Sequence, residues 1–288
     1  MKQFLFRIAV FSALLFLVTN CSTTKDKKSV VTLSKAGIAE EEEIYIPHIK
    51  SERKNYFPET LAENQWVDSI YNQMTFEDKV GQLFMVAAYS NKDSIHTNAI
   101  KKLVRDYKIG GVIFFQGGPK RQARLTNLYQ SLAKVPLFVG IDAEWGMSMR
   151  LDSTFRYPFN MTLGAIKDLK LVEKVGVAMA KESKRMGVHF NFAPVLDINT
   201  NPKNPIIGFR SFGENKVSVA EHAIALMNGT QGQGIFATGK HFPGHGDTST
   251  DSHYALPVVN ATADHIEKVE LYPYKRMFDE GLVSVMVA

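Results

Sequence analysis

The chain has 288 residues, of which 45% are hydrophobic and 22% charged, a composition typical of a globular protein and unlike that of a long disordered chain. Its net charge of +5 is a small excess, and no basic block with interleaved aromatic residues occurs, so nucleic-acid binding is not expected. The chain has one cysteine, which excludes an internal disulfide bond.

The first 21 residues have the features of an export signal. Lys2 and Arg7 precede an apolar run at residues 8–18 that only Ser12 interrupts. The run is too short to cross a bilayer, which takes ~20 residues, but it has the length of a signal-peptide core. We therefore expect residues 1–21 to direct export rather than to join the fold.

The single cysteine, Cys21, lies just after this run. The segment around it resembles the signal of a bacterial lipoprotein, in which such a cysteine is lipidated and becomes the mature N-terminus. The resemblance implies a protein held by lipid at a periplasmic or outer membrane, without a spanning helix. A soluble periplasmic protein is the alternative, because Asn20 stands where such signals have a small residue.

Residues 22–60 are predicted to form a polar tether. They contain a lysine-rich stretch and the four consecutive carboxylates of residues 40–43, without a regular apolar period. The folded domain is expected at residues 61–288, beginning with a helix at residues 61–71 whose apolar side chains could fall along one stripe.

From residue 80 onward, short apolar runs alternate with longer segments that are compatible with helices. The runs predict strands at residues 80–88, 112–115, 136–141, 189–196, 235–238 and 283–287. The longer segments predict helices at residues 97–107, 121–133, 168–186, 217–231 and 264–280. This alternation indicates an α/β fold with a parallel sheet covered by helices, either a barrel or an open doubly wound sheet.

Polar side chains follow several predicted strands: Asp142 the third, Asp197 the fourth, and Lys240 with His241 the fifth. A (β/α)8 TIM-type barrel collects its active site from the carboxyl ends of several strands, whereas an open sheet concentrates its site at one crossover point. We therefore favour the barrel. About six strands are predicted and the chain stops within the sixth, so we expect an incomplete barrel and a fragment of a longer protein.

The densest polar stretch, residues 240–253, holds three of the eight histidines in the chain. One interpretation is a metal site, although the spacing matches no recognised zinc motif. A second is a general acid–base pair in which an aspartate orients a histidine, and both Asp251 with His253 and Asp247 with His245 fit it. A third is a polar loop without chemistry. Spacing alone does not choose among them.

The residues from Lys240 to Thr248, followed by Asp251-Ser252-His253, resemble the signature of the β-N-acetylglucosaminidase branch of family 3 glycoside hydrolases. The resemblance extends from about Trp66 to Ala288. It implies a cofactor-independent hydrolase that removes β-linked N-acetylhexosamines such as N-acetylglucosamine. In that branch the aspartate and histidine of the tripeptide form the catalytic dyad, which implies catalytic roles for Asp251 and His253, with His253 as acid and base.

A second stretch, residues 140–150, resembles the sugar-binding turn of the same family. The resemblance implies that Asp142 and Arg150 hold substrate, and a charged acceptor suits sugar hydroxyls because its hydrogen bonds are stronger than those of a neutral one. A salt bridge with a structural role only is the alternative. The turn has Trp145 where the family has a second glycine.

The stretch at residues 204–213 resembles the family's loop after the fourth strand, which implies a substrate-binding role for Arg210. Lys240 and His241 match the binding pair at the end of the fifth strand. Asp197 is expected to brace the loop rather than to contact substrate. His189, between apolar neighbours, is expected to be a packed strand residue.

The resemblance also implies a retaining mechanism with an aspartate nucleophile on a loop after the seventh strand, beyond residue 288. Asp279 is no substitute, because it lies on the helix before the sixth strand. We expect the chain alone not to turn over substrate, and the full-length protein to act on peptidoglycan fragments. The alternatives are a non-catalytic sugar-binding lipoprotein and a metal-dependent hydrolase that uses the histidine and aspartate cluster.

Overall fold

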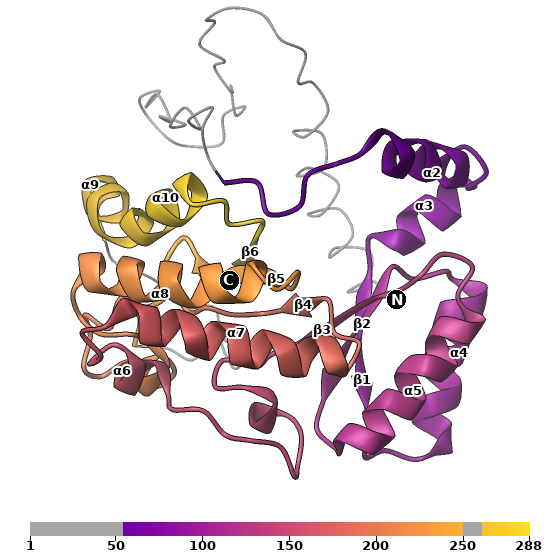
Figure 1. Cartoon of the computed structure of the whole chain (residues 1–288), viewed down its shortest axis with the longest axis horizontal. Helices are drawn as coiled ribbons and strands as arrows, with labels where there is room; N and C mark the ends of the chain where they lie inside the picture. The colour runs from indigo at the N-terminus through magenta and orange to yellow at the C-terminus, as the bar shows by residue number, and fades with distance from the viewer. Residues whose placement is uncertain (1–53, 250–260) are drawn as a thin grey trace, which may run out of the picture. The chain divides into compact units, whose positions relative to one another are not determined.

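The computed structural model describes residues 54–249 and 261–288, and its strands form one parallel sheet in the order β1-β2-β3-β4-β5-β6 (Figure 1). Each strand pairs in parallel with the next one along the chain. The strands are β1 (Met85–Tyr89), β2 (Gly111–Phe115), β3 (Phe138–Ile141), β4 (Phe190–Asn191), β5 (Phe236–Phe242) and β6 (Ser284–Val287). The predicted fold, an incomplete TIM-type barrel, is confirmed.

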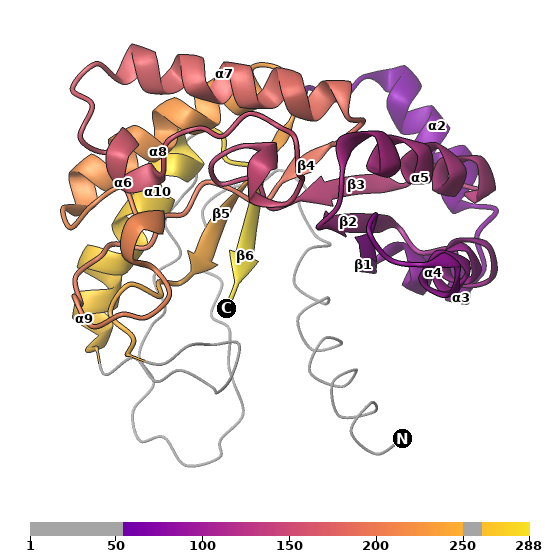
Figure 2. The same cartoon turned by 90° about the horizontal axis from the view of Figure 1, so that it is seen from below.

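Helices cover the outer side of the curved sheet (Figure 2). The helices in the described residues are α2 (Leu61–Tyr71), α3 (Phe76–Gln82), α4 (Ser94–Asp106), α5 (Pro119–Leu132), α6 (Asn160–Leu163), α7 (Leu169–Arg185), α8 (Lys216–Gln231), α9 (Ala263–His265) and α10 (Leu271–Asp279). Those whose side chains pack on the sheet are α4, α5, α7, α8 and α10. A π-helical turn, Ile266–Glu270, joins α9 to α10. Several helices begin where a polar side chain accepts a hydrogen bond from a free N–H of the first turn, as Asn215 does for α8.

Two hydrophobic clusters fill the space between the sheet and the helices. One lies between β2, β3 and the helices α4 and α5, and the other between β5 and the helices α7, α8 and α10. In the second cluster two glycines let α7 and α8 pack closely: a Cβ atom at Gly176 would lie 2.3 Å from the Leu226 carbonyl oxygen. These clusters hold the strands in register, and therefore fix where each strand ends.

The first predicted strand, at residues 80–88, is wrong in its first half. Helix α3 begins after Thr75, which caps it by accepting a hydrogen bond from the Asp78 N–H, and Glu77 and Asp78 lie in its first turn. The helix continues to Gln82. The strand begins only at Met85. An apolar run of this length does not reveal whether its start belongs to a helix or to a strand.

The fourth strand is shorter and the fifth longer than predicted. Regular pairing in β4 covers only Phe190–Asn191, and Pro194, three residues after the strand ends, has no N–H to donate. The Ala193 and Pro194 carbonyls still accept hydrogen bonds from Thr238 and Lys240. Strand β5 continues to Phe242, so Lys240 and His241 are residues of the strand itself, near its carboxyl end, rather than of the loop after it.

The described residues before α2 contact the amino end of the sheet. The Tyr56 hydroxyl donates to Asn228 Oδ1 at 2.5 Å, and the Phe57 ring lies 4.3 Å from the Phe236 ring, centroid to centroid. Lys54 pairs with Glu280 at 3.4 Å. The boundary predicted at residue 61 stays a prediction, but residues 54–57 pack on the barrel.

Within residues 54–249 and 261–288, none of the helices has the length and apolarity needed to cross a membrane. The predicted export signal, Cys21 and most of the predicted tether lie outside the described residues, as do Asp251 and His253 of the predicted dyad.

Candidate active site

Charged side chains gather at the carboxyl ends of strands β3 and β5. Asp142 follows β3 directly, Lys240 lies near the end of β5, and Asp197 follows the irregular segment after β4. Because the six strands are parallel, these ends lie at the same edge of the sheet (Figure 2). This is the edge at which TIM-type barrels carry their active sites.

Asp142 is held between two cations. Its Oδ2 atom lies 2.6 Å from Arg150 Nη2 and its Oδ1 atom 3.0 Å from Lys240 Nζ. Burial alone would raise the pKa of Asp142, but the charges of Lys240 and Arg150 outweigh burial and lower it. The carboxylate is therefore ionised near neutral pH, with oriented lone pairs at the edge of the sheet.

Glu144, two residues further on, is a site residue that the sequence analysis missed. Its side chain is 0% exposed, and Lys240 Nζ lies 2.7 Å from its Oε1 atom. Arg210 binds it with two hydrogen bonds, from Nη2 to Oε1 at 2.8 Å and from Nε to Oε2 at 3.0 Å. Burial raises the pKa of Glu144, whereas Lys240 and Arg210 lower it, and the net pKa is about 2.

Arg210 ends a 3₁₀ turn, Gly208–Arg210. The Asn160 side chain donates to the Arg210 carbonyl oxygen at 2.7 Å, and Arg210 Nη1 donates to the Ile206 carbonyl oxygen at 3.2 Å. Asn204 ties this loop to the loop after β5, because its amide donates to the carbonyl oxygens of His245 and Gly246 at 2.8 and 3.0 Å. The guanidinium group is thus fixed from several sides before any ligand binds.

His241 is oriented by Asp197, whose side chain is 0% exposed. The His241 Nδ1 atom lies 2.6 Å from Asp197 Oδ2, and the His241 and His245 backbone N–H groups also donate to this carboxylate, the latter at 2.8 Å. Because a carboxylate only accepts, Nδ1 carries the proton, and Nε2 lies 3.4 Å from Arg210 Nη2. Asp197 thus holds the backbone at the end of β5 and in the loop that follows it.

A further buried carboxylate, Glu270, lies under the loop that follows β5. A Cβ atom at Gly244 would lie 2.5 Å from Glu270 Oε2, and His265 Nε2 lies 3.5 Å from Glu270 Oε1. Burial and the negative charge of Asp197 raise the pKa of Glu270 to about 7, against the opposing effect of His265. The sequence alone predicts no role for Glu270.

The structure thus brings five predicted binding residues together: Asp142, Arg150, Arg210, Lys240 and His241. Asp279 ends α10 and is exposed, outside this group. His189 packs in the strand region as expected, and its Nδ1 atom accepts a hydrogen bond from the Val139 N–H at 3.0 Å. Within residues 54–249 and 261–288, no three histidine, cysteine, aspartate or glutamate side chains are placed to hold a metal ion.

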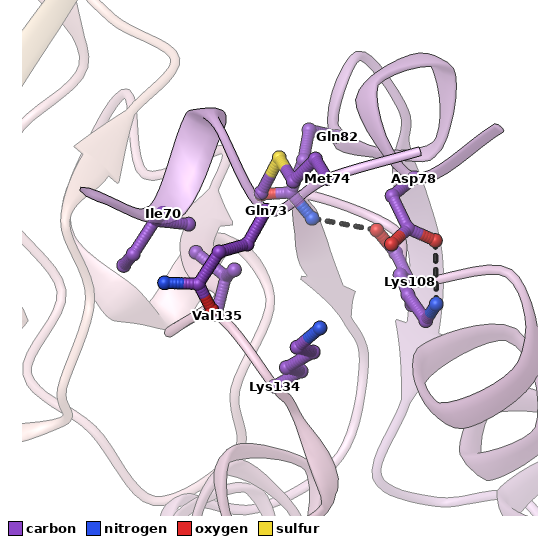
Figure 3. A pocket seen from close by; sticks show the side chains of 8 residues that line it. All are labelled: Ile70, Gln73, Met74, Asp78, Gln82, Lys108, Lys134 and Val135. Carbon is purple, nitrogen blue, oxygen red and sulfur yellow. Dashed lines mark hydrogen bonds and ion pairs between the residues drawn. The ribbon is translucent and has the colours of Figure 1, made fainter. Parts of the chain in front are cut away.

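A pocket with a volume of about 160 Å³ lies at the opposite, amino end of the strands (Figure 3). Lys108 contributes to its wall, pairing with Asp78 at 2.5 Å and accepting at its carbonyl oxygen a hydrogen bond from Gln82 at 2.6 Å. Interactions at this end of a TIM-type barrel serve stability. We assign the pocket no functional role.

Two known proteins with similar sequences are named hexosaminidases. The "Beta-hexosaminidase A" of Pseudoalteromonas piscicida is 38% identical over 188 residues, which are 61% of this chain and 31% of that protein. The "Beta-hexosaminidase" of Nitrosomonas eutropha is 39% identical over 190 residues, which are 62% of this chain and 54% of that protein. The chain therefore spans about a third to a half of the length of these relatives.

Two solved structures with similar folds have related names. A glycoside hydrolase family 3 β-N-acetylglucosaminidase from Paenibacillus sp. is similar over 75% of this chain and 42% of its own, with a TM-score of 0.69 and 38% identity. NagZ from Neisseria gonorrhoeae, solved with N-trifluoroacetyl-D-glucosamine, is similar over 71% of this chain and 62% of its own, with a TM-score of 0.62 and 32% identity.

The family model described as "Glycosyl hydrolase family 3 N terminal domain" matches residues 75–288. This range contains all six strands and every charged side chain of the cluster at their carboxyl ends. Because the family model covers most of the chain and the barrel matches solved members of the family, this chain belongs to glycosyl hydrolase family 3.

Proposed function

We propose that the full-length protein containing this chain is an exported, retaining β-N-acetylhexosaminidase that removes N-acetylglucosamine from peptidoglycan fragments. The observation that carries the proposal is the Asp142 carboxylate, held between Lys240 and Arg150 at the carboxyl edge of a family 3 barrel. The names of the similar proteins support the choice of sugar.

The charge cluster has the chemistry needed to bind one sugar unit. A carboxylate whose position is fixed by two cations can accept hydrogen bonds from two adjacent sugar hydroxyls, and such charge-assisted bonds are strong. Arg150 offers a further donor, since its buried Nε atom has no hydrogen-bond partner among the described residues. Lys240, Arg210 and His241 would surround the rest of the ring.

The proposed chemistry is a double displacement. His253, oriented by Asp251, protonates the glycosidic oxygen while an aspartate from beyond residue 288 attacks the anomeric carbon and forms a glycosyl-enzyme. His253 then removes a proton from water as the water cleaves that intermediate, so the acid of the first step becomes the base of the second. Histidine suits both steps because its ordinary pKa of ~6.5 lies near neutral pH.

The proposed location is a membrane surface outside the cytoplasm. The support is the short apolar run that ends just before Cys21, in a chain with one cysteine. In the proposed lipoprotein, replacing Cys21 with serine moves the full-length protein from the membrane fraction to the soluble periplasmic fraction. A wild-type protein that is already soluble there would support the unlipidated alternative.

Turnover by the full-length protein tests the proposal. We expect hydrolysis of an aryl β-N-acetylglucosaminide with retention of configuration at the anomeric carbon, observed by proton NMR, and without loss on addition of a chelator. Binding of sugar without turnover would favour the non-catalytic lipoprotein. Loss of activity to the chelator would favour the metal-dependent hydrolase.

The binding role of Asp142 has a matched control on the same turn. Asp142→Asn keeps an acceptor but loses the charge, and losing one charge-assisted hydrogen bond of about 2 kcal/mol lowers kcat/KM about 30-fold. Asp152→Asn alters an exposed carboxylate that pairs with Arg121, and should leave kcat/KM within about twofold. Equal effects of the two substitutions would contradict the binding role.

A further inference from the structure

Two carboxyl groups, those of Asp197 and Glu270, are buried against the loop at residues 243–249, and their surroundings differ. Asp197 accepts hydrogen bonds from the backbone N–H groups of His241 and His245 and from the His241 ring. Glu270 is only 3% exposed, and neither of its carboxyl oxygens has a hydrogen-bond partner among the described residues. A buried carboxyl group without donors is far more costly when it is ionised than when it is neutral.

The groups that face Glu270 do not make up for the missing donors. Asp197, after β4, and Asp247, in the loop after β5, bring negative charge near it, and burial and these charges raise the pKa of Glu270 to about 7. His265 of α9 opposes them, with Nε2 at 3.5 Å from Glu270 Oε1. Tyr274 of α10 is buried, and the negative charge of Glu270 helps to raise the pKa of its hydroxyl.

The two lysines of the same helical segment pair with other carboxylates. Lys268 Nζ lies 2.6 Å from Asp264 Oδ1, and Lys275 Nζ pairs with Glu267. Neither ammonium group therefore neutralises Glu270. The neutral carboxyl group is the form that this part of the fold accommodates.

The backbone of the loop lies directly on the Glu270 side chain. A Cβ atom at Gly244 would lie 2.5 Å from Glu270 Oε2 and 2.8 Å from Glu270 Cβ. Two residues further on, a Cβ atom at Gly246 would lie 1.8 Å from the Ile198 carbonyl oxygen. Because the loop is in close contact at both points, a movement of the Glu270 carboxyl group would displace the loop.

We propose that Glu270 is a positioning residue, which as a neutral carboxyl group holds the loop at residues 243–249 in place, and that its ionisation lowers the rate of glycoside hydrolysis. The inference rests on the proposed function. Ionised Glu270 adds a second buried negative charge near Asp197, which orients His241 at the candidate sugar site. Glu270 contacts no substrate and acts through Asp197 and through Gly244, against which it packs.

The test is the pH dependence of kcat/KM for dinitrophenyl N-acetyl-β-glucosaminide in the full-length protein. The leaving group of this substrate needs no proton, so loss of the His253 proton does not limit the value. The wild-type value should fall about 30-fold between about pH 6 and pH 8.5, as Glu270 loses its proton. Glu270→Gln, which stays neutral, should fall less than about threefold over the same range.

Glu267→Gln is the matched control, because it neutralises a carboxylate that is 43% exposed on the same π-helical turn. It should keep the wild-type decline. Glu270→Met, which is neutral and of similar length, repeats the test without a polar group and should also remove the decline.

A wild-type value that stays constant over this pH range would overturn the inference. So would a decline in both Glu270 variants that matches the wild type, or a failure of both to fold, and each of these results leaves the proposed function intact. An unsubstituted protein that does not hydrolyse the glycoside would overturn the proposed function, and the inference with it.

Discussion

Lys240 joins Asp142 to Glu144. Its Nζ atom lies 3.0 Å from Asp142 Oδ1 and 2.7 Å from Glu144 Oε1, so one buried ammonium group neutralises part of two carboxylates that are two residues apart. Asp142 is at the edge of the cluster and Glu144 is at its bottom, where Arg210 completes the charge balance. Ion pairs therefore hold these side chains to one another, and the Asp142 carboxylate lies at the edge of the group, where a ligand could reach it.

The first prediction concerns this ammonium group. Lys240→Met leaves Glu144 buried with one counter-charge fewer, and breaking a buried pair in this way costs about 3–5 kcal/mol of unfolding free energy. Arg121→Met is the control, because Arg121 pairs with Asp152 on the surface, where such a pair contributes about 0–1 kcal/mol. Urea unfolding measures the free energy of unfolding of both variants. Similar losses of that free energy in the two variants would show that the buried ion pairs of Lys240 do not stabilise the fold more than a surface pair does.

The second prediction concerns acid stability. The folded-state pKa of Glu144, about 2, lies below its ordinary value of 4.5, so the native state binds fewer protons than the unfolded state between these two values. Its stabilisation is present above pH 4.5 and is lost as the pH falls toward 2, in total about 3 kcal/mol. Glu144→Gln should flatten the unfolding free energy in this range. An unchanged slope would mean that Glu144 is not ionised in the fold.

The third prediction concerns Glu270, whose pKa is shifted in the opposite direction to that of Glu144. The folded-state pKa of Glu270, about 7, lies above its ordinary value of 4.5, so between these values the native state binds more protons than the unfolded state. Glu270 therefore destabilises the protein increasingly as the pH rises from 4.5 to 7. Glu270→Gln should be more stable than the wild type at pH 7.5 and equal to it near pH 4.

Glu221→Gln is the matched control for Glu270, because Glu221 is exposed on α8. It should leave the pH dependence of unfolding unchanged. If Glu270→Gln also leaves that pH dependence unchanged, the carboxylate does not have the raised pKa on which this prediction depends. A loss of stability at pH 7.5 would instead mean that the ionised side chain has a stabilising partner.

The order and type of most elements could be predicted because each β–α pair has its own hydrophobic period. The predictions that failed concern the ends of individual strands. Residues 80–88 are apolar apart from Gln82, and the cap at Thr75 indicates that the first of them belong to α3. The fourth strand is cut short where Asn191 uses its side chain to bind the backbone of Ala143, a contact between residues far apart in the chain.

The residues of the site likewise divide into those that the sequence could predict and those that only the fold reveals. Asp142, Arg150, Arg210, Lys240 and His241 stand in recognisable stretches, so their proximity could be expected before the fold was known. Glu144 stands two residues after Asp142 in one of those stretches, and that neighbouring carboxylate was the signal that could have revealed it. Glu270 could not have been found, because its carboxyl group gains importance only from burial against Gly244, which is distant in the sequence.

His253 is proposed to protonate the leaving oxygen, and the dependence of the hydrolysis rate on the leaving group tests this role most directly. In the full-length protein, His253→Ala should lower hydrolysis of a disaccharide, whose leaving group needs a proton, about 1,000-fold. Hydrolysis of a dinitrophenyl glycoside, whose leaving group needs none, should fall less than about tenfold in its first step. Equal loss on both substrates would contradict the assignment.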